Sequence, residues 1–123
     1  MALTKLVKVD LVTADAFTGV FGVVNATNIT DIVATGATCI WSGTGYTVTC
    51  TFDGTDNAEK LLNAQKFQGW LADQLQPILG PNSNQKKAYE LFKGYTMAKL
   101  HEVTGIVHTG GTANTALVSI AVA

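Results

Sequence analysis

Residues 56–81 read DNAEKLLNAQKFQGWLADQLQPILGP, and this stretch decides the fold because it predicts one long amphipathic helix. Asp56 can cap the helix with its carboxylate, and Glu59 can reach back to the cap amide in a capping box. Apolar residues recur at spacings of three and four along a single side: Leu61, Ala64, Phe67, Leu71, Leu75 and Ile78. A helix with such a stripe needs an apolar surface beneath it, which the rest of the chain must supply.

The end of this helix carries two signals. Gly80 followed by Pro81 predicts the stop, because glycine accepts the left-handed cap and proline cannot continue the hydrogen-bond ladder. Pro77 comes earlier and predicts either an end near Leu75 or a kink in the last turn. The sequence leaves these two alternatives open.

Trp70 is expected on the polar side of the helix, beside Asn63 and Lys66. An indole in that position is either a half-buried residue at the edge of the core or a contact for a partner. Trp70 and Lys66 are therefore the candidate interface residues of the helix.

The clearest strand signal lies in residues 38–53, TCIWSGTGYTVTCTFD. A two-residue turn at residues 44–45 places Cys39 opposite Cys50. In that register one face is apolar and consists of Cys39, Trp41, Tyr46, Val48, Cys50 and Phe52. The pattern and the turn agree on one pairing, which a slip of one residue would destroy.

Four further segments extend the order of elements. Residues 3–13 predict a half-exposed strand, whose inner face consists of Val7, Val9 and Leu11. Residues 16–24 fit either a helical stripe or a strand, and their glycines and β-branched valines favour a strand. Residues 84–100 predict a second helix, and residues 103–109 predict another strand.

Residues 116–123 predict the final strand, with Val118, Ile120 and Val122 on one face. This strand has no charged residue, so it must be paired and covered. The cover can be its own sheet or a neighbouring subunit, which makes these three residues candidate interface residues too.

The order of the elements is strands, two helices, then strands, without a regular alternation. This order predicts an α+β fold in which a mostly antiparallel sheet has a two-helix hairpin packed on one side. No repeat or linker divides the chain, so residues 1–123 are expected to form a single domain.

The composition indicates a surface with few charges. Only 14% of the residues are charged, whereas 47% are hydrophobic and 17 are threonine. Such a surface suits a protein packed against copies of itself or against another subunit. A compact β-rich domain with a threonine-coated sheet face would have the same composition.

The sequence also disfavours nucleic acids and membranes as partners. All eight basic residues are lysine and the net charge is −1, so the chain lacks the electrostatic footprint of a nucleic-acid-binding protein. No run of about 18 apolar residues could span a membrane. Residues 1–10 mix lysines into a strand pattern, so we expect synthesis in the cytosol without a signal peptide.

The chemistry-bearing residues form no recognisable catalytic, cofactor or metal motif. Cys39 and Cys50 could form a disulfide, but paired core thiols are the favoured interpretation for a cytosolic protein. His101 and His108 match no ligand spacing with the cysteines, and in one strand they would point to opposite faces. We therefore predict no catalytic residue, no cofactor and no metal.

These observations favour a non-enzymatic structural subunit that self-assembles or packs in a larger particle. Size and composition suggest a virus or phage virion component, such as a capsid-decorating, connector or tail protein. The alternative is a small-molecule-binding module or small enzyme with a pocket between sheet and helices. Its lining would be Trp41, Tyr46, Phe67 and Tyr95, with His101 or Asp53 as the polar group. An adaptor that binds through Trp70 is a third hypothesis.

Overall fold

The computed structural model describes residues 5–79 and 87–123. In chain order its elements are β1 (Leu6–Thr13), β2 (Ala16–Asn25), the short 3-10 helix η1 (Ala26–Asn28), β3 (Asp31–Thr35), β4 (Thr38–Gly43), β5 (Tyr46–Phe52), α1 (Asn57–Leu79), β6 (Tyr89–Glu90), α2 (Met97–Thr104) and β7 (Leu117–Val122). The predicted fold class is confirmed, because the structure has a mostly antiparallel seven-stranded sheet and two helices.

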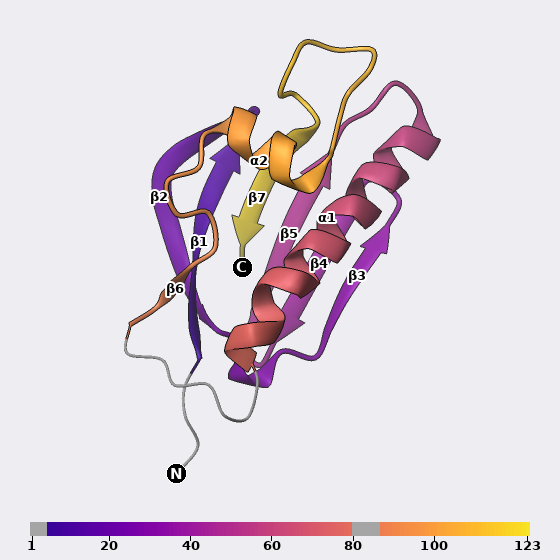
Figure 1. Ribbon diagram of the computed structural model, residues 1–123. Coiled ribbons are helices and arrows are strands. Elements are labelled where there is room, and N and C mark those ends of the chain that lie inside the picture. Colours follow the sequence, from indigo (N-terminus) through magenta and orange to yellow (C-terminus); the bar gives the residue numbers. More distant parts are fainter. Residues whose placement is uncertain (1–4, 80–86) are drawn as a thin grey trace.

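The strands follow the order β2-β1-β7-β5-β4-β3, and every neighbouring pair on this path is antiparallel. The short strand β6 pairs in parallel with β1 at Val7 and Lys8. The last strand, β7, therefore lies in the middle of the sheet, between β1 and β5 (Figure 1). Its own sheet pairs it on both sides.

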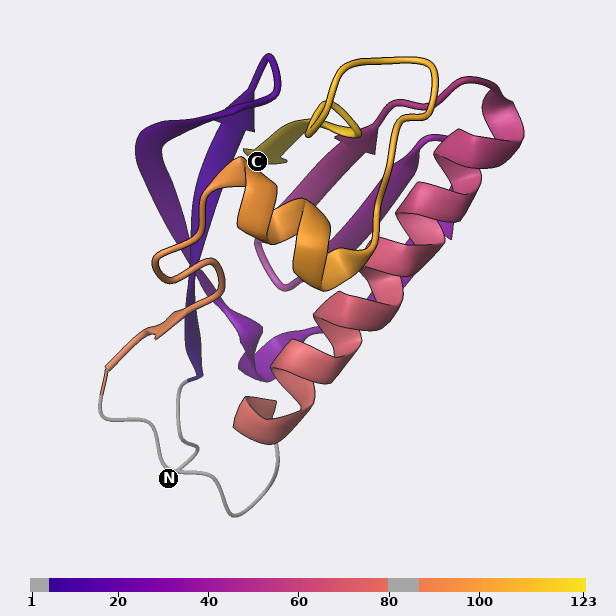
Figure 2. The ribbon, with the colours of Figure 1, turned by 45° about the horizontal axis from the view of Figure 1, so that its top comes forward.

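Both helices lie on the same face of the sheet, as the two views show (Figures 1 and 2). Helix α1 crosses β3, β4 and β5. The core between the layers contains large side chains that are almost fully buried: Trp41, Phe52, Phe67, Leu71, Leu75, Leu100, Leu117 and Ile120. In the described part of the chain nothing forms a layer over the opposite face, which we call the open face.

The hairpin of β4 and β5 has the predicted register. Cys39 pairs with Cys50 and Trp41 with Val48, across the expected turn at residues 44–45. Gly45 supplies the positive φ of 84° that this turn requires. The strand favoured for residues 16–24 is also confirmed, as β2.

Strand β1 differs from the expectation on one face. Val7 and Val9 are buried as predicted, but Val12 takes the buried position in place of Leu11. The register shifts there, because Asp10 pairs with Phe21 whereas Val12 pairs with Phe17. Three residues of β2 thus face one residue of β1, and this bulge reverses the alternation.

Helix α1 begins as predicted, with a different role for Glu59. The Asp56 carboxylate accepts the N–H of Glu59 at 2.8 Å, as a cap should. The capping box is wrong, because Glu59 bonds to the N–H of Thr55, one residue before the cap. The predicted stripe faces the core, with Leu61 and Ile78 only half-buried at its ends.

The helix continues through Pro77 to Leu79, so an end near Leu75 is wrong. The hydrogen bond that Pro77 cannot donate would reach the carbonyl of Asp73, an exposed residue. Water can replace that bond, and the last turn survives. The stop predicted at residues 80–81 lies outside the described residues.

Of the helix predicted over residues 84–100, residues 97–100 are helical, residues 87–96 are not, and residues 84–86 lie outside the described residues. β6 pairs with β1 instead, and Gly94 follows with a φ of +71°, which a helix cannot contain. Helix α2 begins only after Thr96, whose hydroxyl accepts the N–H of Lys99. The apolar spacing misled because it crossed these breaks.

The strand predicted over residues 103–109 is also wrong. Helix α2 ends at Thr104 with a left-handed cap at Gly105, and an irregular loop follows to residue 116. The Thr104 hydroxyl bonds to the carbonyl of Leu100, which offsets the strand preference of a β-branched residue. Strand β3, an edge strand of five residues, was not predicted.

Candidate functional site

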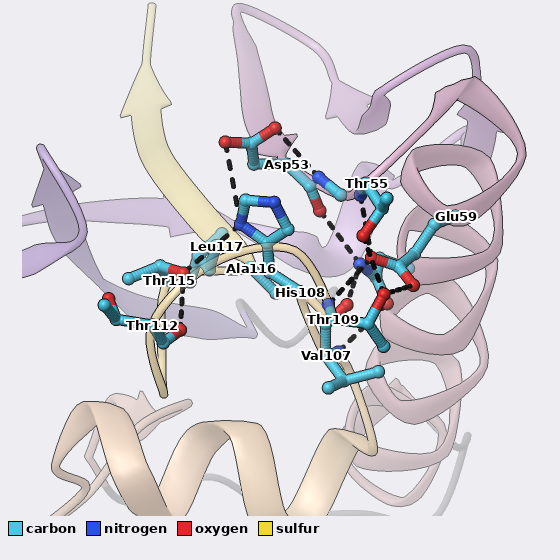
Figure 3. A network of polar contacts seen from close by, with 12 residues as sticks. Asp53, Thr55, Glu59, Val107, His108, Thr109, Thr112, Thr115, Ala116 and Leu117 are labelled. Atoms are coloured by element: carbon cyan, nitrogen blue, oxygen red, sulfur yellow. Dashed lines mark hydrogen bonds and ion pairs between the residues drawn. The ribbon is translucent and has the colours of Figure 1, made fainter.

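A polar network fastens the loop of residues 105–116 to the first turns of α1 and to the end of β5 (Figure 3). At its centre lies Asn63, which is fully buried. Its amide donates to the carbonyls of Asp53 and Val107 at 2.9 and 2.7 Å, and its oxygen accepts the N–H of Val107 at 3.1 Å. The expectation that Asn63 lies on the polar side of the helix is therefore wrong.

Glu59 forms the second part of this network, at the surface. One carboxylate oxygen accepts the N–H groups of Thr55 and Thr109 at 2.8 and 3.0 Å. The other accepts the hydroxyl of Thr109 at 2.8 Å. These bonds, first of all the one from the Thr55 backbone, lower the pKa of Glu59 to about 2. Glu59 thus holds the loop as a carboxylate.

His108 lies in the third part. Its Nδ1 is 3.3 Å from the hydroxyl oxygen of Thr115 and 3.8 Å from a carboxylate oxygen of Asp53. The Thr115 hydroxyl donates its proton to the carbonyl of Thr112, so Nδ1 of His108 must be the donor in the contact with Thr115. His108 therefore does not activate this hydroxyl as a nucleophile.

His101 is fixed more tightly. Its Nε2 accepts the N–H groups of Ala116 and Leu117 at 3.1 and 3.4 Å. Because backbone amides only donate, Nδ1 carries the proton and donates to the carbonyl of Met97 at 2.7 Å. Both ring nitrogens are thus committed to joining α2 to β7.

The two histidines line one cavity of about 250 Å³, together with Ile106, Val107, Gly111, Thr112, Ala113 and Asn114. The expectation that they point to opposite faces of a strand is wrong, because one lies on α2 and the other in the loop. Within residues 5–79 and 87–123, no three histidine, cysteine or acidic side chains gather as a metal site. The polar groups of this region hold the fold together.

Cys39 and Cys50 face each other as buried free thiols. Burial raises the pKa of Cys39 to about 12 and that of Cys50 well above its usual value. Because the thiolate is the reactive form, these groups act as core side chains.

The helix residues predicted at an interface have contacts within the subunit. Trp70 stacks on Phe92 with ring centroids 5.6 Å apart, and it also touches Phe67 and Tyr95. Lys66 donates to the carbonyl of Gly105 at 3.2 Å and so caps the end of α2. Their role at an interface stays a prediction.

The three residues named on the last strand also lie within the sheet. Ile120 is buried, whereas Val118 and Val122 are half-buried. A register shift between Thr51 and Phe52 leaves Val118 as the extra residue of a bulge. For these residues too, a role at an interface stays a prediction.

The three most exposed large apolar side chains of the described residues lie elsewhere, on β2. Leu6 of β1 and Val20, Phe21 and Val23 of β2 are 37, 57, 50 and 50% exposed. We call these four residues the outer patch. The amino group of Lys8 lies 4.3 Å from the centre of the Phe21 ring and bonds to Glu90 at 3.2 Å, so this neighbouring positive charge is paired.

The outer patch was not predicted from the sequence, although a signal was present. β2 has no charged residue in ten positions, and strands exposed to water normally carry some. An uncharged strand at the edge of a sheet is the pattern that would have found it.

Comparisons with protein-family models, with curated proteins and with solved structures found no significant match. In the described residues, no helix has the length and apolar character needed to cross a membrane.

Proposed function

We propose that this protein is a structural subunit that assembles with copies of itself through the open face and edges of its sheet. The observation that carries the proposal is the outer patch, where Val20, Phe21 and Val23 are each half-exposed or more on one outermost strand. Exposed apolar side chains that gather on one edge strand are typical of interaction surfaces.

The location of the polar groups supports the same proposal. The buried asparagine and both histidines are engaged in internal bonds, whereas the outer patch holds an aromatic ring and branched side chains. Interfaces are enriched in such apolar anchors and depleted of charge at their centres.

A virus or phage particle is the kind of assembly we propose. Its support is compositional: a chain of 123 residues with 14% charged residues and a threonine-rich sheet suits permanent packing in a shell, connector or tail. A small-molecule-binding module or small enzyme is the alternative, and the cavity at His101 and His108 is where it would act.

Light scattering over a dilution series tests the assembly. We expect the wild-type chain to give masses that are multiples of 12.9 kDa, and Phe21→Ser to lower them. Val107→Ser is the control, because Val107 is 45% exposed in the loop near α2. A wild-type protein that is monomeric at every concentration would refute the proposal.

A further inference from the structure

We infer, resting on the assembly proposed above, that copies join edge to edge, with β2 of one subunit pairing with β3 of a second copy. β2 and β3 are the two outermost strands of the sheet. Five antiparallel steps separate them, so they run in opposite directions. A copy placed alongside in the same orientation therefore presents β3 antiparallel to β2 and continues the sheet without a break.

Both edges have few charges and no proline to protect them against such pairing. β2 contains no charged residue and no proline, and β3 contains a single charge, Asp31. The regular part of β2, which pairs with Leu6 to Asp10 of β1, is five residues long, and β3 also has five residues. Two edge strands with a single charge between them are ready to extend a sheet.

The side chains of the two edges match on the open face. Phe21 and Val23 face Asp10 and Lys8 of β1, whose neighbours Val7 and Val9 are buried. They therefore point to the open face. Val33 of β3 faces Ile40, which lies between the buried Cys39 and Trp41, and it points to the same face with 44% of its surface exposed.

One register of β2 against β3 of the second copy places apolar side chains opposite each other and brings opposite charges near each other. If Phe21 faces Val33 of the second copy, Val23 faces Asp31 of that copy. Lys8 lies on the other side of Val23, on the same face. Alternate strands are about 10 Å apart, which the side chains of a lysine and an aspartate can span. The pairing thus brings Asp31 of one copy toward Lys8 of the other, which also bonds to Glu90 of its own chain.

One group at the β3 edge is already occupied. The Gln68 amide donates to the carbonyl of Ile32 at 2.8 Å. A pairing strand would replace this amide by a backbone N–H, so one hydrogen bond of about 1 kcal/mol is exchanged for another. The free energy of pairing therefore comes from the other hydrogen bonds between the strands and from the contacts of the apolar side chains.

Three matched substitutions test the pairing by solution mass. Val23→Glu repels Asp31 of a second copy while facing its own Lys8, and Val33→Glu blocks the β3 edge. Val107→Glu is the control, with the same charge change at a site of similar exposure. We expect the two edge variants to be monomers and the control to assemble like the wild type.

Mixing the two edge variants gives the decisive result. Each retains one intact edge, so an equal mixture should form dimers of twice 12.9 kDa and nothing larger. A mixture that stays monomeric, or a Val33→Glu variant that assembles normally, overturns edge pairing while the assembly itself stands. A monomeric wild type overturns both.

A crosslink keeps the inference testable if an edge variant does not fold, as judged by circular dichroism. Chains with Val23→Cys and Asp31→Cys should form a mixed disulfide dimer on oxidation, because these positions face each other in the proposed register. Chains with Val107→Cys and Asp31→Cys should not. Equal crosslinking in both mixtures would contradict the register.

Discussion

Replacing Asn63 by aspartate should destabilise the fold strongly, although the two side chains have almost the same volume. The aspartate keeps an oxygen for the N–H of Val107. The donor to the carbonyls of Asp53 and Val107 becomes an oxygen, and these carbonyls lose their partner. Two lost bonds at about 1 kcal/mol each, together with unsatisfied buried groups, give a loss of about 3–5 kcal/mol.

Urea unfolding followed by circular dichroism measures this loss. With a slope of about 2 kcal/mol per molar urea, the midpoint should fall by about 2 M. The control is Gln65→Glu, the same change of amide to acid at an exposed position of the same helix, where we expect less than about 0.5 kcal/mol. If Asn63→Asp shifts the midpoint no further than Gln65→Glu, the bonds of Asn63 do not hold the loop.

Three further predictions follow from other local features. Because the pKa of Glu59 is lowered from 4.5 to about 2, its carboxylate stabilises the fold at pH values above 4.5, and this contribution is lost as the pH falls toward about 2. Glu59→Gln should therefore flatten the pH dependence of the melting temperature between these values, and an unchanged pH dependence would contradict the prediction. Because burial raises the pKa of Cys39 to about 12 and that of Cys50 well above its usual value, a thiol reagent at neutral pH should react with neither in the folded protein and with both in urea. Gly94→Ala should cost about 1–2 kcal/mol in thermal unfolding, since Gly94 has a φ of +71°, and a neutral result would count against this backbone conformation.

The parts of the fold that could be predicted are those where two local signals agree. In residues 38–53 the alternation of apolar side chains and the turn at residues 44–45 specify one register, and the structure has it. In residues 84–109 the signals conflict. Apolar spacing favoured a helix across Gly94 and β-branched residues favoured a strand after His101, whereas Thr96 and Gly105 set the actual ends of α2. In this segment the cap residues determined where the helix begins and ends, and the apolar periodicity did not.

The polar network could have been located in part. Asn63 lies four residues before Phe67 and eight before Leu71, so it falls on the apolar stripe of the helix, where a buried amide signals a specific set of bonds. Its partners lie 10 and 44 residues away and depend on how the loop returns to the helix. Local pattern cannot supply such contacts.

The twist of the sheet makes the proposed pairing more specific. Neighbouring strands rotate by roughly 20–25° in a constant direction, so a path of six strands turns by roughly 120–150° from one edge to the same edge of the next copy. This rotation takes place about the axis along which the copies are displaced, because each new strand is added sideways. Repeating a rotation and a displacement along one axis gives a screw, and a screw does not close. Edge pairing of β2 with β3 therefore favours an open filament with about one third of a turn per subunit over a flat ring, and electron microscopy of the assembled protein would distinguish the two.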